Sequence, residues 1–215
     1  MAKPRPSTSS AAASVAVPPI VVRGDAGRPV AALTFDAGAG AGSTADVLDA
    51  LQEFGVRSTF FLTGEWADAN QDLVRRIVAD GHEVSNHSYS HPDMTTVGED
   101  RIVSELARTE AAVQRIAGVT TKPYFRPPFG AYDARLLRIL AQQGYRAIYW
   151  TLDSTDWRDD STTQSVLRRV INSTGNGYIV VHHSSSPKTA EALRAILREL
   201  KAKGFALVKL SEMLD

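Results

Sequence analysis

The sequence predicts an α/β protein whose largely parallel sheet forms a (β/α) barrel, and three observations lead to this fold class. From Val30 onward, short β-branched and aromatic runs alternate with longer segments of helical periodicity, as in repeated β-α units. Several predicted helices end at a glycine that precedes a strand, which is typical of a left-handed helix cap. Polar residues follow several predicted strands, at the edge where parallel α/β folds carry their active sites.

The predicted elements alternate along the chain. The strands are expected at Ala31–Phe35, Ser58–Leu62, Glu83–Asn86, Pro123–Arg126, Ala147–Thr151, Tyr178–His182 and Ala206–Val208. The helices are expected at Ala45–Phe54, Ala67–Asp80, Glu99–Ile116, Ala134–Gln143, Thr163–Asn172 and Thr189–Lys203. The capping glycines are Gly55, Gly81, Gly144 and Gly204.

Length and composition favour one soluble globular domain. The chain has 215 residues, which suits a single α/β barrel. Its 24 basic residues balance 24 acidic ones, so no nucleic-acid or anionic-membrane partner is predicted. It contains no cysteine, which excludes disulfides and thiolate zinc sites, so that any metal must be bound by His, Asp or Glu. No apolar run is long enough to span a membrane.

The domain boundary is placed near residue 28. Residues 1–27 are predicted to be a disordered leader or linker, because Met1 to Pro19 is rich in Ala, Ser and Pro. The longest apolar run there, Ala11 to Val17, is interrupted by Ser14 and lacks an intact signal-peptide core, although an export signal could have been trimmed. Residues 28–215 form the predicted catalytic domain.

Five chemically active side chains are expected at one edge of the sheet. They lie at the carboxyl ends of five different predicted strands and are Asp36, His87, Arg126, Asp153 and His183. Because the carboxyl ends of parallel strands meet at one edge, these side chains should act together.

His87 and His91 are a candidate metal-binding pair. A spacing of four would place both imidazoles on one face of a helix, but Pro92 disfavours helical geometry at His91, so a loop or a single turn is expected. Taken alone, such a pair is more often two ordinary histidines than a metal site. The position at the shared edge favours the functional interpretation.

Asp36 ends a buried strand before a glycine-rich loop. It is either a turn residue or a general base at the mouth of the barrel. Arg126 could pair with Asp36 and keep it ionised, although a plain surface salt bridge is the alternative. Pro127 and Pro128 fix the backbone, so that the N–H of Phe129 could serve as an oxyanion donor.

His183, with Asp153 or Asp156 close to it, is a candidate general acid. A carboxylate close to a histidine raises the pKa of the imidazole and favours the charged form that can protonate a departing amine. Trp157 offers a flat apolar face on which a sugar ring could stack, although a single aromatic residue is more often part of the core. His82 is interpreted as structural.

The ordered motifs resemble the polysaccharide deacetylases of the NodB-homology type, carbohydrate esterase family 4, over Val30 to Leu214. They are Thr34-Phe35-Asp36-Ala37-Gly38, His87-Ser88-Tyr89-Ser90-His91, Phe125-Arg126-Pro127-Pro128-Phe129-Gly130, Asp153-Ser154-Thr155-Asp156-Trp157 and Val181-His182-His183. The resemblance implies a distorted (β/α) barrel of about seven strands. It also implies removal of N-acetyl groups from amino-sugar polymers such as peptidoglycan or chitin-like oligosaccharides.

The resemblance also assigns roles to the residues that match each motif. Asp36 is the expected catalytic base, steadied by Arg126, and His87 and His91 are the expected metal ligands. The Phe129 N–H is expected to help hold the oxyanion.

The later motifs supply the expected acid and the sugar contacts. His183 is expected to be the general acid, with His182 as its rival. Asp153 is expected to tune it, with Asp156 as the alternative. The expected substrate-binding residues are Phe129, Trp157 and Tyr132.

One position departs from the family pattern. The family's second Asp in the first motif, a metal ligand, is Ala37 here. The expected cofactor is a divalent metal, zinc with cobalt or nickel as alternatives, and the loss of one carboxylate should weaken its binding. Asp36 itself or Asp93 could complete the coordination sphere.

Three other interpretations remain open at this point. The chain could be a non-catalytic or weakened carbohydrate-binding relative, because of Ala37. It could be a deacetylase of another acyl substrate, such as acetyl-xylan, or a barrel with chance polar residues at its edge. The family implies an extracellular or cell-envelope location. The sequence identifies neither the sugar polymer nor the oligomeric state.

Overall fold

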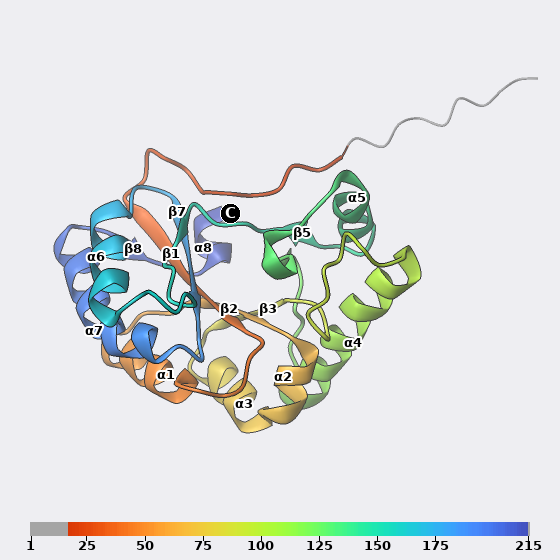
Figure 1. Ribbon diagram of the computed structural model, residues 1–215, viewed down its shortest axis with the longest axis horizontal. Helices are drawn as coiled ribbons and strands as arrows, with labels where there is room; N and C mark the ends of the chain where they lie inside the picture. Colours follow the sequence, from red (N-terminus) through yellow and green to blue (C-terminus); the bar gives the residue numbers. More distant parts are fainter. Residues whose placement is uncertain (1–16, 215) are drawn as a thin grey trace, which may run out of the picture.

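The computed structural model describes residues 17–214, which fold into a parallel sheet surrounded by helices (Figure 1). The strands are β1 (Val30–Ala37), β2 (Thr59–Leu62), β3 (Glu83–Asn86), β4 (Tyr124–Phe125), β5 (Arg146–Ala147), β6 (Leu152–Asp153), β7 (Tyr178–His183) and β8 (Ala206–Leu207). The helices are α1 (Thr44–Glu53), α2 (Gly64–Ala69), α3 (Gln71–Ala79), α4 (Glu99–Ala117), α5 (Ala134–Gln142), α6 (Thr163–Ser173), α7 (Pro187–Ala202) and α8 (Leu210–Leu214), with a 3₁₀ turn, η1 (Pro128–Gly130).

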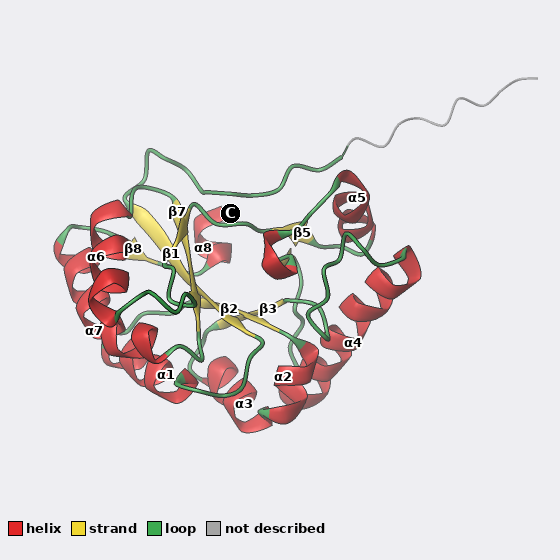
Figure 2. Cartoon of the chain, viewed as in Figure 1, coloured by secondary structure: helices red, strands yellow, loops and turns green. Residues whose placement is uncertain are grey.

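The sheet curls into a distorted barrel. Its strand order is β5-β4-β3-β2-β1-β7-β6, with β8 added beside β1, and every strand pair is parallel. Helices line the outer side of the curled sheet (Figure 2). A curled parallel sheet whose strands alternate with helices along the chain is the predicted α/β barrel, so the fold class is confirmed. The helices cover the outer face of the sheet, as parallel sheets require.

The start of the described chain spans the gap between β5, at one end of the strand order, and β7, which is next to the other end. Val21 forms a parallel bridge with Ile148, and Arg23 forms an antiparallel bridge with Tyr178. The N–H of Val21 also donates to the carbonyl of Ala147 at 2.8 Å. The early segment therefore crosses the seam of the barrel.

These contacts correct part of the predicted leader at 1–27. Residues 17–27 hold backbone hydrogen bonds to the barrel, including one of 2.8 Å from the N–H of Gly24 to the carbonyl of Gly177. The composition of the segment hid this role, because a single strap that fills a seam needs only a few backbone contacts and no periodic apolar pattern. The rest of the predicted leader, residues 1–16, lies outside the described residues.

Two predicted elements are each split in the structure. The strand expected at Ala147–Thr151 becomes β5 and β6, because the chain leaves β4 there and crosses to β7, where the N–H of Thr151 donates to the carbonyl of Ile179. The helix expected at Ala67–Asp80 breaks at Asn70 (φ −129°), whose side chain donates to the carbonyl of Trp66. Asn competes with helical hydrogen bonding in this way and favours helix ends.

The packing of the buried strand β1 determines where Asp36 lies. Leu33, Phe35 and Ala37 pack into the largest core cluster, between the sheet and its helices, whereas Ala32 belongs to the cluster inside the curl. Because side chains alternate along a strand, Asp36 follows Ala32 on the inner face. Full burial of a side chain such as Phe35 contributes roughly 1.5–3 kcal/mol, which anchors the strand that carries Asp36.

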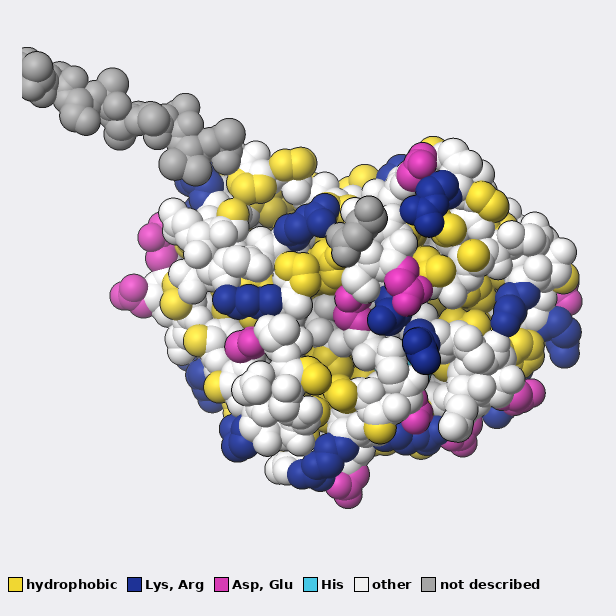
Figure 3. Space-filling view, turned by 180° about the vertical axis from the view of Figure 1, so that it is seen from behind, with side chains coloured by type: hydrophobic (Ala, Val, Ile, Leu, Met, Phe, Trp, Pro, Cys, Tyr) yellow, Lys and Arg dark blue, Asp and Glu magenta, His cyan; other side chains and the backbone are white. Residues whose placement is uncertain are grey.

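Charged side chains are interspersed on the surface. On the face seen in Figure 3, Lys and Arg alternate with Asp and Glu over the described part of the chain. Among residues 17–214, no helix combines the length and the apolar character needed to cross a bilayer.

Candidate active site

A cleft of about 580 Å³ opens at the carboxyl ends of the strands. The residues that line it lie at the carboxyl ends of six strands, β1 and β3 to β7, or in the loops that follow them: Asp36, Gly38, Ala39, His87, His91, Pro127, Phe129, Gly130, Trp150, Asp153, Trp157, Val181 and His183. Seven of the nine predicted site residues are among them. The exceptions are Arg126, which is buried beneath the cleft, and Tyr132, which lies beside it.

Asp36 and Arg126 form a buried ion pair. Nη1 of Arg126 donates to Oδ1 of Asp36 at 2.6 Å, and Nη2 donates to the carbonyl of Tyr149 at 3.2 Å. Arg126 is 0% exposed and its guanidinium lies over the ring of Phe61, 4.1 Å from the ring centre. Such a charge is stable inside the protein only when it is paired, so the pair orients Asp36 firmly.

The ion pair determines the charge of Asp36. Burial by itself would raise the pKa of this carboxyl, but the charge of Arg126, followed by those of His87 and His183, outweighs burial and places the pKa below its ordinary value. Asp36 is therefore a carboxylate at neutral pH. Its second oxygen, Oδ2, lies 3.7 Å from Nε2 of His87 and faces the cleft.

His87 and His91 come together on the loop after β3. Their ring centres lie 4.9 Å apart, nearly perpendicular to each other. Nδ1 of His87 is 2.8 Å from the carbonyl of Arg126. Because a carbonyl can only accept, this Nδ1 carries the proton and Nε2 has a free lone pair. Burial lowers the pKa of His87 to about 4, so the ring is neutral near pH 7.

This donor set fits a divalent metal with fewer protein ligands than a catalytic zinc site usually has. A ligating histidine commonly donates its other ring N–H to a carbonyl, as His87 does to Arg126. Within residues 17–214, however, no group of three or more His, Cys, Asp or Glu side chains is arranged to hold a metal. Asp93 does not supply the missing ligand, because its Oδ1 accepts from the N–H and hydroxyl of Thr95 in a turn outside the cleft.

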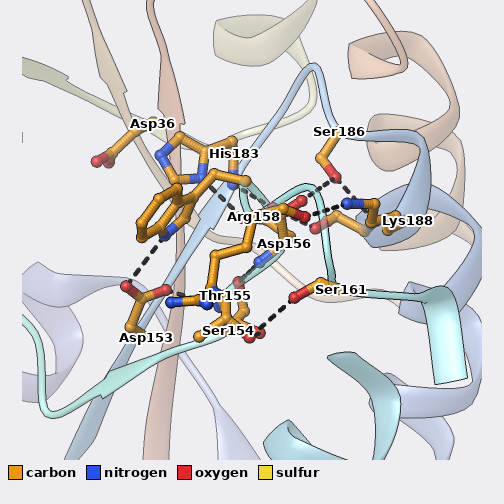
Figure 4. A network of polar contacts seen from close by, with 12 residues as sticks. Asp36, Asp153, Ser154, Thr155, Asp156, Arg158, Ser161, His183, Ser186 and Lys188 are labelled. Carbon is orange, nitrogen blue, oxygen red and sulfur yellow. Dashed lines mark hydrogen bonds and ion pairs between the residues drawn. The ribbon is translucent and has the colours of Figure 1, made fainter. Parts of the chain in front are cut away.

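His183 is held by Asp156 (Figure 4). Oδ1 of Asp156 lies 2.7 Å from Nδ1 of His183, and Oδ2 accepts the backbone N–H of His183 at 2.8 Å. Thr189 donates a further hydrogen bond to the same Oδ2. Asp153, the residue preferred from the sequence, instead accepts from the N–H of Thr155 and from Nε1 of Trp157. The alternative, Asp156, is therefore the partner of the imidazole.

The contacts of His183 favour its charged form. Burial would lower the pKa of His183, but the hydrogen bond and the charge of Asp156 outweigh it and raise the pKa above the ordinary value. Burial would likewise raise the pKa of Asp156, yet its bond to His183 and the nearby imidazoles lower it to about 2. His182, the rival acid, is fully buried against Phe35, and burial lowers its pKa to about 4. It does not reach the cleft.

Asp36 and His183 are neighbours across two strands. They are partners in the parallel register of β1 and β7, and both line the cleft. Figure 4 shows Asp36 beside His183, with Asp156 bonded to the other side of the imidazole. The arrangement presents a carboxylate that can accept a proton and an imidazolium that can donate one.

Aromatic side chains surround the opening. Phe129 is 71% exposed and its ring meets that of His91, 4.6 Å between centres. Trp157 is 58% exposed and also lines the cleft. Trp150, which the sequence analysis missed, lines the cleft as well and stacks on Tyr149 with ring centres 4.0 Å apart. Its only sequence signal was its place near the end of a predicted strand.

Comparison with known proteins places this chain in a family. The family model for polysaccharide deacetylase matches residues 23–148, more than half of the chain.

This chain belongs to the polysaccharide deacetylase family.

A peptidoglycan-N-acetylglucosamine deacetylase of Bacillus cereus is 34% identical over 186 residues, which are 85% of this chain and 67% of that protein. The structure of PdaA from Bacillus subtilis, a family 4 carbohydrate esterase, has a TM-score of 0.86 and 31% identity, covering 90% of this chain and 84% of that one. Three relatives are longer than this chain, which spans 61 to 72% of their lengths.

A third similar protein is a pseudoenzyme. A family 4 carbohydrate esterase pseudoenzyme of Bacillus anthracis has a TM-score of 0.87 and 30% identity, covering 92% of this chain and 69% of that one. A mutant of that protein with restored enzymatic activity has the same TM-score and 31% identity. The family therefore contains deacetylases and at least one pseudoenzyme with this fold, so membership of the family does not by itself establish catalysis.

Proposed function

We propose that this protein is a hydrolase that removes N-acetyl groups from amino-sugar polymers and leaves a free amine. The observation that carries the proposal is the pairing of a carboxylate base and an imidazolium acid, Asp36 and His183, on neighbouring strands of one cleft. Each has its own buried partner, Arg126 or Asp156, which fixes its charge. A site that only binds sugar would need neither pair.

Asp36 would take the proton from the attacking water. Its Oδ1 is occupied by Arg126, so Oδ2 is the oxygen available for the proton. The lowered pKa of Asp36 makes it a weak base, which suits a water whose own pKa falls as it attacks. Arg126 then stabilises the carboxyl group in the orientation that the transfer requires.

His183 would complete the reaction by giving a proton to the departing nitrogen. Its Nδ1 is bonded to Asp156, so Nε2 is the atom that donates. The backbone N–H of Phe129, at the edge of the cleft, is proposed to stabilise the oxyanion. Phe129 has a left-handed backbone (φ 58°), which turns the chain after the two prolines at the edge of the site.

The proposed cofactor is a divalent metal, zinc with cobalt or nickel as alternatives, and His87 and His91 would hold it. When bound, such an ion would polarise the acetamide carbonyl as a Lewis acid. Ala37 is 1% exposed and brings no ligand, so binding should be weaker than in a site with three protein ligands.

The proposed substrates are peptidoglycan or chitin-like oligosaccharides. Exposed aromatic rings beside a polar cleft suit sugar rings, which combine an apolar face with polar edges. Phe129 and Trp157 come from loops after different strands, β4 and β6, so they offer two such faces at the opening. Action on these polymers would place the protein outside the cell or in its envelope.

A second candidate is a carbohydrate-binding relative with little or no catalysis. Ala37 favours it, together with the similarity to the pseudoenzyme of Bacillus anthracis. In that case the cleft would still bind sugar through its aromatic rings. Deacetylation of another acyl substrate, such as acetyl-xylan, is distinguished by the same assay.

The deciding experiment is acetate release by metal-stripped protein, with and without zinc, cobalt or nickel. N-acetylglucosamine oligomers, peptidoglycan and acetyl-xylan are the substrates, and Asp36→Asn is the control. Metal-restored release from amino sugars that is lost in the control supports the proposal. Folded protein that releases no acetate with any metal or substrate, yet binds the oligomers, supports the binding relative.

A further inference from the structure

Glu105 of α4 is a buried carboxylate that the proposed chemistry does not use. It is 0% exposed and lies in the middle of a helix whose neighbouring turns pack on the core. Nη2 of its exposed partner, Arg101, lies 2.7 Å from Oε1 of Glu105. Burying a carboxylate is unfavourable unless several donors replace water, so its other contacts must account for its position.

Those contacts lead to the loop that carries the two imidazoles. Oε2 of Glu105 accepts the backbone N–H of Tyr89 and that of Ser90, each at 2.7 Å. Oε1 accepts the hydroxyl of Ser90 at 2.9 Å. One buried carboxylate thus binds two consecutive residues between His87 and His91.

The loop needs such support because its backbone is strained. Ser88 (φ 62°) and His91 (φ 57°) both adopt the left-handed conformation. For a residue with a Cβ atom, this conformation is unfavourable, because the Cβ atom comes too close to the following carbonyl oxygen. It persists only where surrounding contacts hold it in place.

Every backbone N–H between the two imidazoles has a side-chain acceptor. The N–H of Ser88 donates to Oδ1 of Asn86 at 3.0 Å, and that of His91 donates to Oγ of Ser88 at 3.1 Å. Glu105 accepts the two N–H groups in the middle, those of Tyr89 and Ser90, which lie between the two left-handed residues. Without it, both N–H groups would be left in a partly buried loop with no acceptor, which is unfavourable for each of them.

We propose that Glu105 is a positioning residue that holds His91 in the cleft through the backbone of Tyr89 and Ser90. The inference rests on the proposed role of His91, but the contacts it uses are independent of any metal. Loss of the carboxylate should let the loop relax from its left-handed turn and release the imidazole of His91 from its place beside His87.

The test compares four proteins: wild type, Glu105→Ala, Glu105→Gln and Glu110→Ala. Gln keeps one oxygen that can accept both N–H groups, since both go to Oε2. Glu110 is a matched control, because it also lies on α4 and accepts from Thr120 and Thr121, away from the cleft. It makes no direct contact with Tyr89 or Ser90 and is linked to the loop indirectly, through Thr121 and Asn86. Glu105→Asp is an additional variant that keeps the charge and shortens the side chain, in case Glu105→Ala does not fold.

The readout is the imidazole ¹H–¹⁵N spectrum of the metal-free protein, with His82 as an internal reference. We expect the His91 signals to shift or double in Glu105→Ala or Glu105→Asp, and to match wild type in Glu105→Gln and Glu110→Ala. A zinc titration should show roughly tenfold or greater weakening in Glu105→Ala relative to Glu105→Gln. Melting curves would show whether Glu105→Ala and Glu110→Ala lose similar stability.

Unchanged His91 signals in Glu105→Ala and Glu105→Asp, or an equal change in Glu110→Ala, would overturn the positioning role. The spectra need neither metal nor substrate. If the wild type releases no acetate, and the His91 signals change in Glu105→Ala and Glu105→Asp but not in Glu110→Ala, the proposed function is excluded. The positioning role of Glu105 then still stands.

Discussion

Asp156 holds His183 at two points, through Nδ1 of the imidazole at 2.7 Å and through the backbone N–H at 2.8 Å. The side chain of Asp156 is fully buried, whereas that of His183 is partly exposed to the cleft. A buried carboxylate thus fixes the ring and its charge while the opposite nitrogen stays free.

Asp156→Asn should lower kcat by about 10²-fold or more, because the acid loses the charge that keeps it protonated. In wild type the pKa of His183 is raised, so activity falls only as the pH rises through that raised value. Without the carboxylate the pKa drops, and the fall should begin at lower pH. A pH profile of kcat checks the shift, with Asp153→Asn as the matched control. An Asp153→Asn profile displaced as far as that of Asp156→Asn would contradict the assignment.

Asp156 should also make the protein less stable in acid. Its folded pKa is about 2, below the ordinary value of 3.8. A lowered folded pKa gives stability that is present above pH 4 and is lost as the pH falls towards 2, on the order of 2 kcal/mol. Urea unfolding of wild type and Asp156→Asn between pH 6 and pH 2 measures it. The wild-type advantage should shrink over that interval, and a constant difference would show that Asp156 does not titrate there.

The location of the site was predictable, but the choice of carboxylate was not. The rule that strand ends share one edge brought Asp36, His87 and His183 together correctly. Asp153 and Asp156 follow the same strand, and the sequence favoured the nearer one. Thr155 has a left-handed backbone (φ 61°), which turns the chain so that the later carboxylate meets the imidazole. Neither composition nor periodicity predicts a left-handed backbone at a residue other than glycine.

The contribution of the helices was harder to predict for a related reason. Glu105 lies on the next helix after the loop it holds, and a glutamate in an amphipathic helix is usually a solvated residue, so its position in the sequence predicts no such contact. The strap at residues 17–27 was missed because its role depends on a seam that exists only after the barrel has curled. Local patterns identify the strands and helices, whereas these contacts depend on the tertiary arrangement.

Ala37→Asp should strengthen metal binding. The new carboxylate would stand beside Gly38, whose backbone lies close enough to His91 that an added Cβ would approach the ring at 3.6 Å. A third ligand should raise zinc affinity by about tenfold or more. Isothermal titration of metal-stripped protein measures it, with Ala37→Asn as an uncharged control of similar size. Equal affinities for the two variants would show that position 37, buried against the core, cannot present a ligand.

Trp157→Ala should raise KM with little change in kcat, by about fivefold to tenfold, because a stacking face for the sugar is lost without any change to the base or the acid. Tyr132→Ala is the matched comparison. Tyr132 is also an exposed aromatic residue, but it packs on Tyr149 beside the cleft and does not line it. Steady-state kinetics on N-acetylglucosamine oligomers should therefore show a smaller effect for Tyr132→Ala. A larger effect would mean that the substrate extends over that side.

Arg126→Met should both destabilise the protein and change the pH dependence of the base. Removing the guanidinium leaves Asp36 buried without its partner, a loss of about 3–5 kcal/mol. Burial is the largest influence on the pKa of Asp36 and acts to raise it, so without Arg126 the pKa rises and the onset of activity moves to higher pH.

In the double variant Asp36→Asn with Arg126→Met no charge is left unpaired. Urea unfolding should then show a smaller loss than the sum of the two single variants. Strictly additive losses would mean that the pair contributes no coupling, and that Arg126 stabilises the site through its packing on Phe61 and its bond to Tyr149 alone.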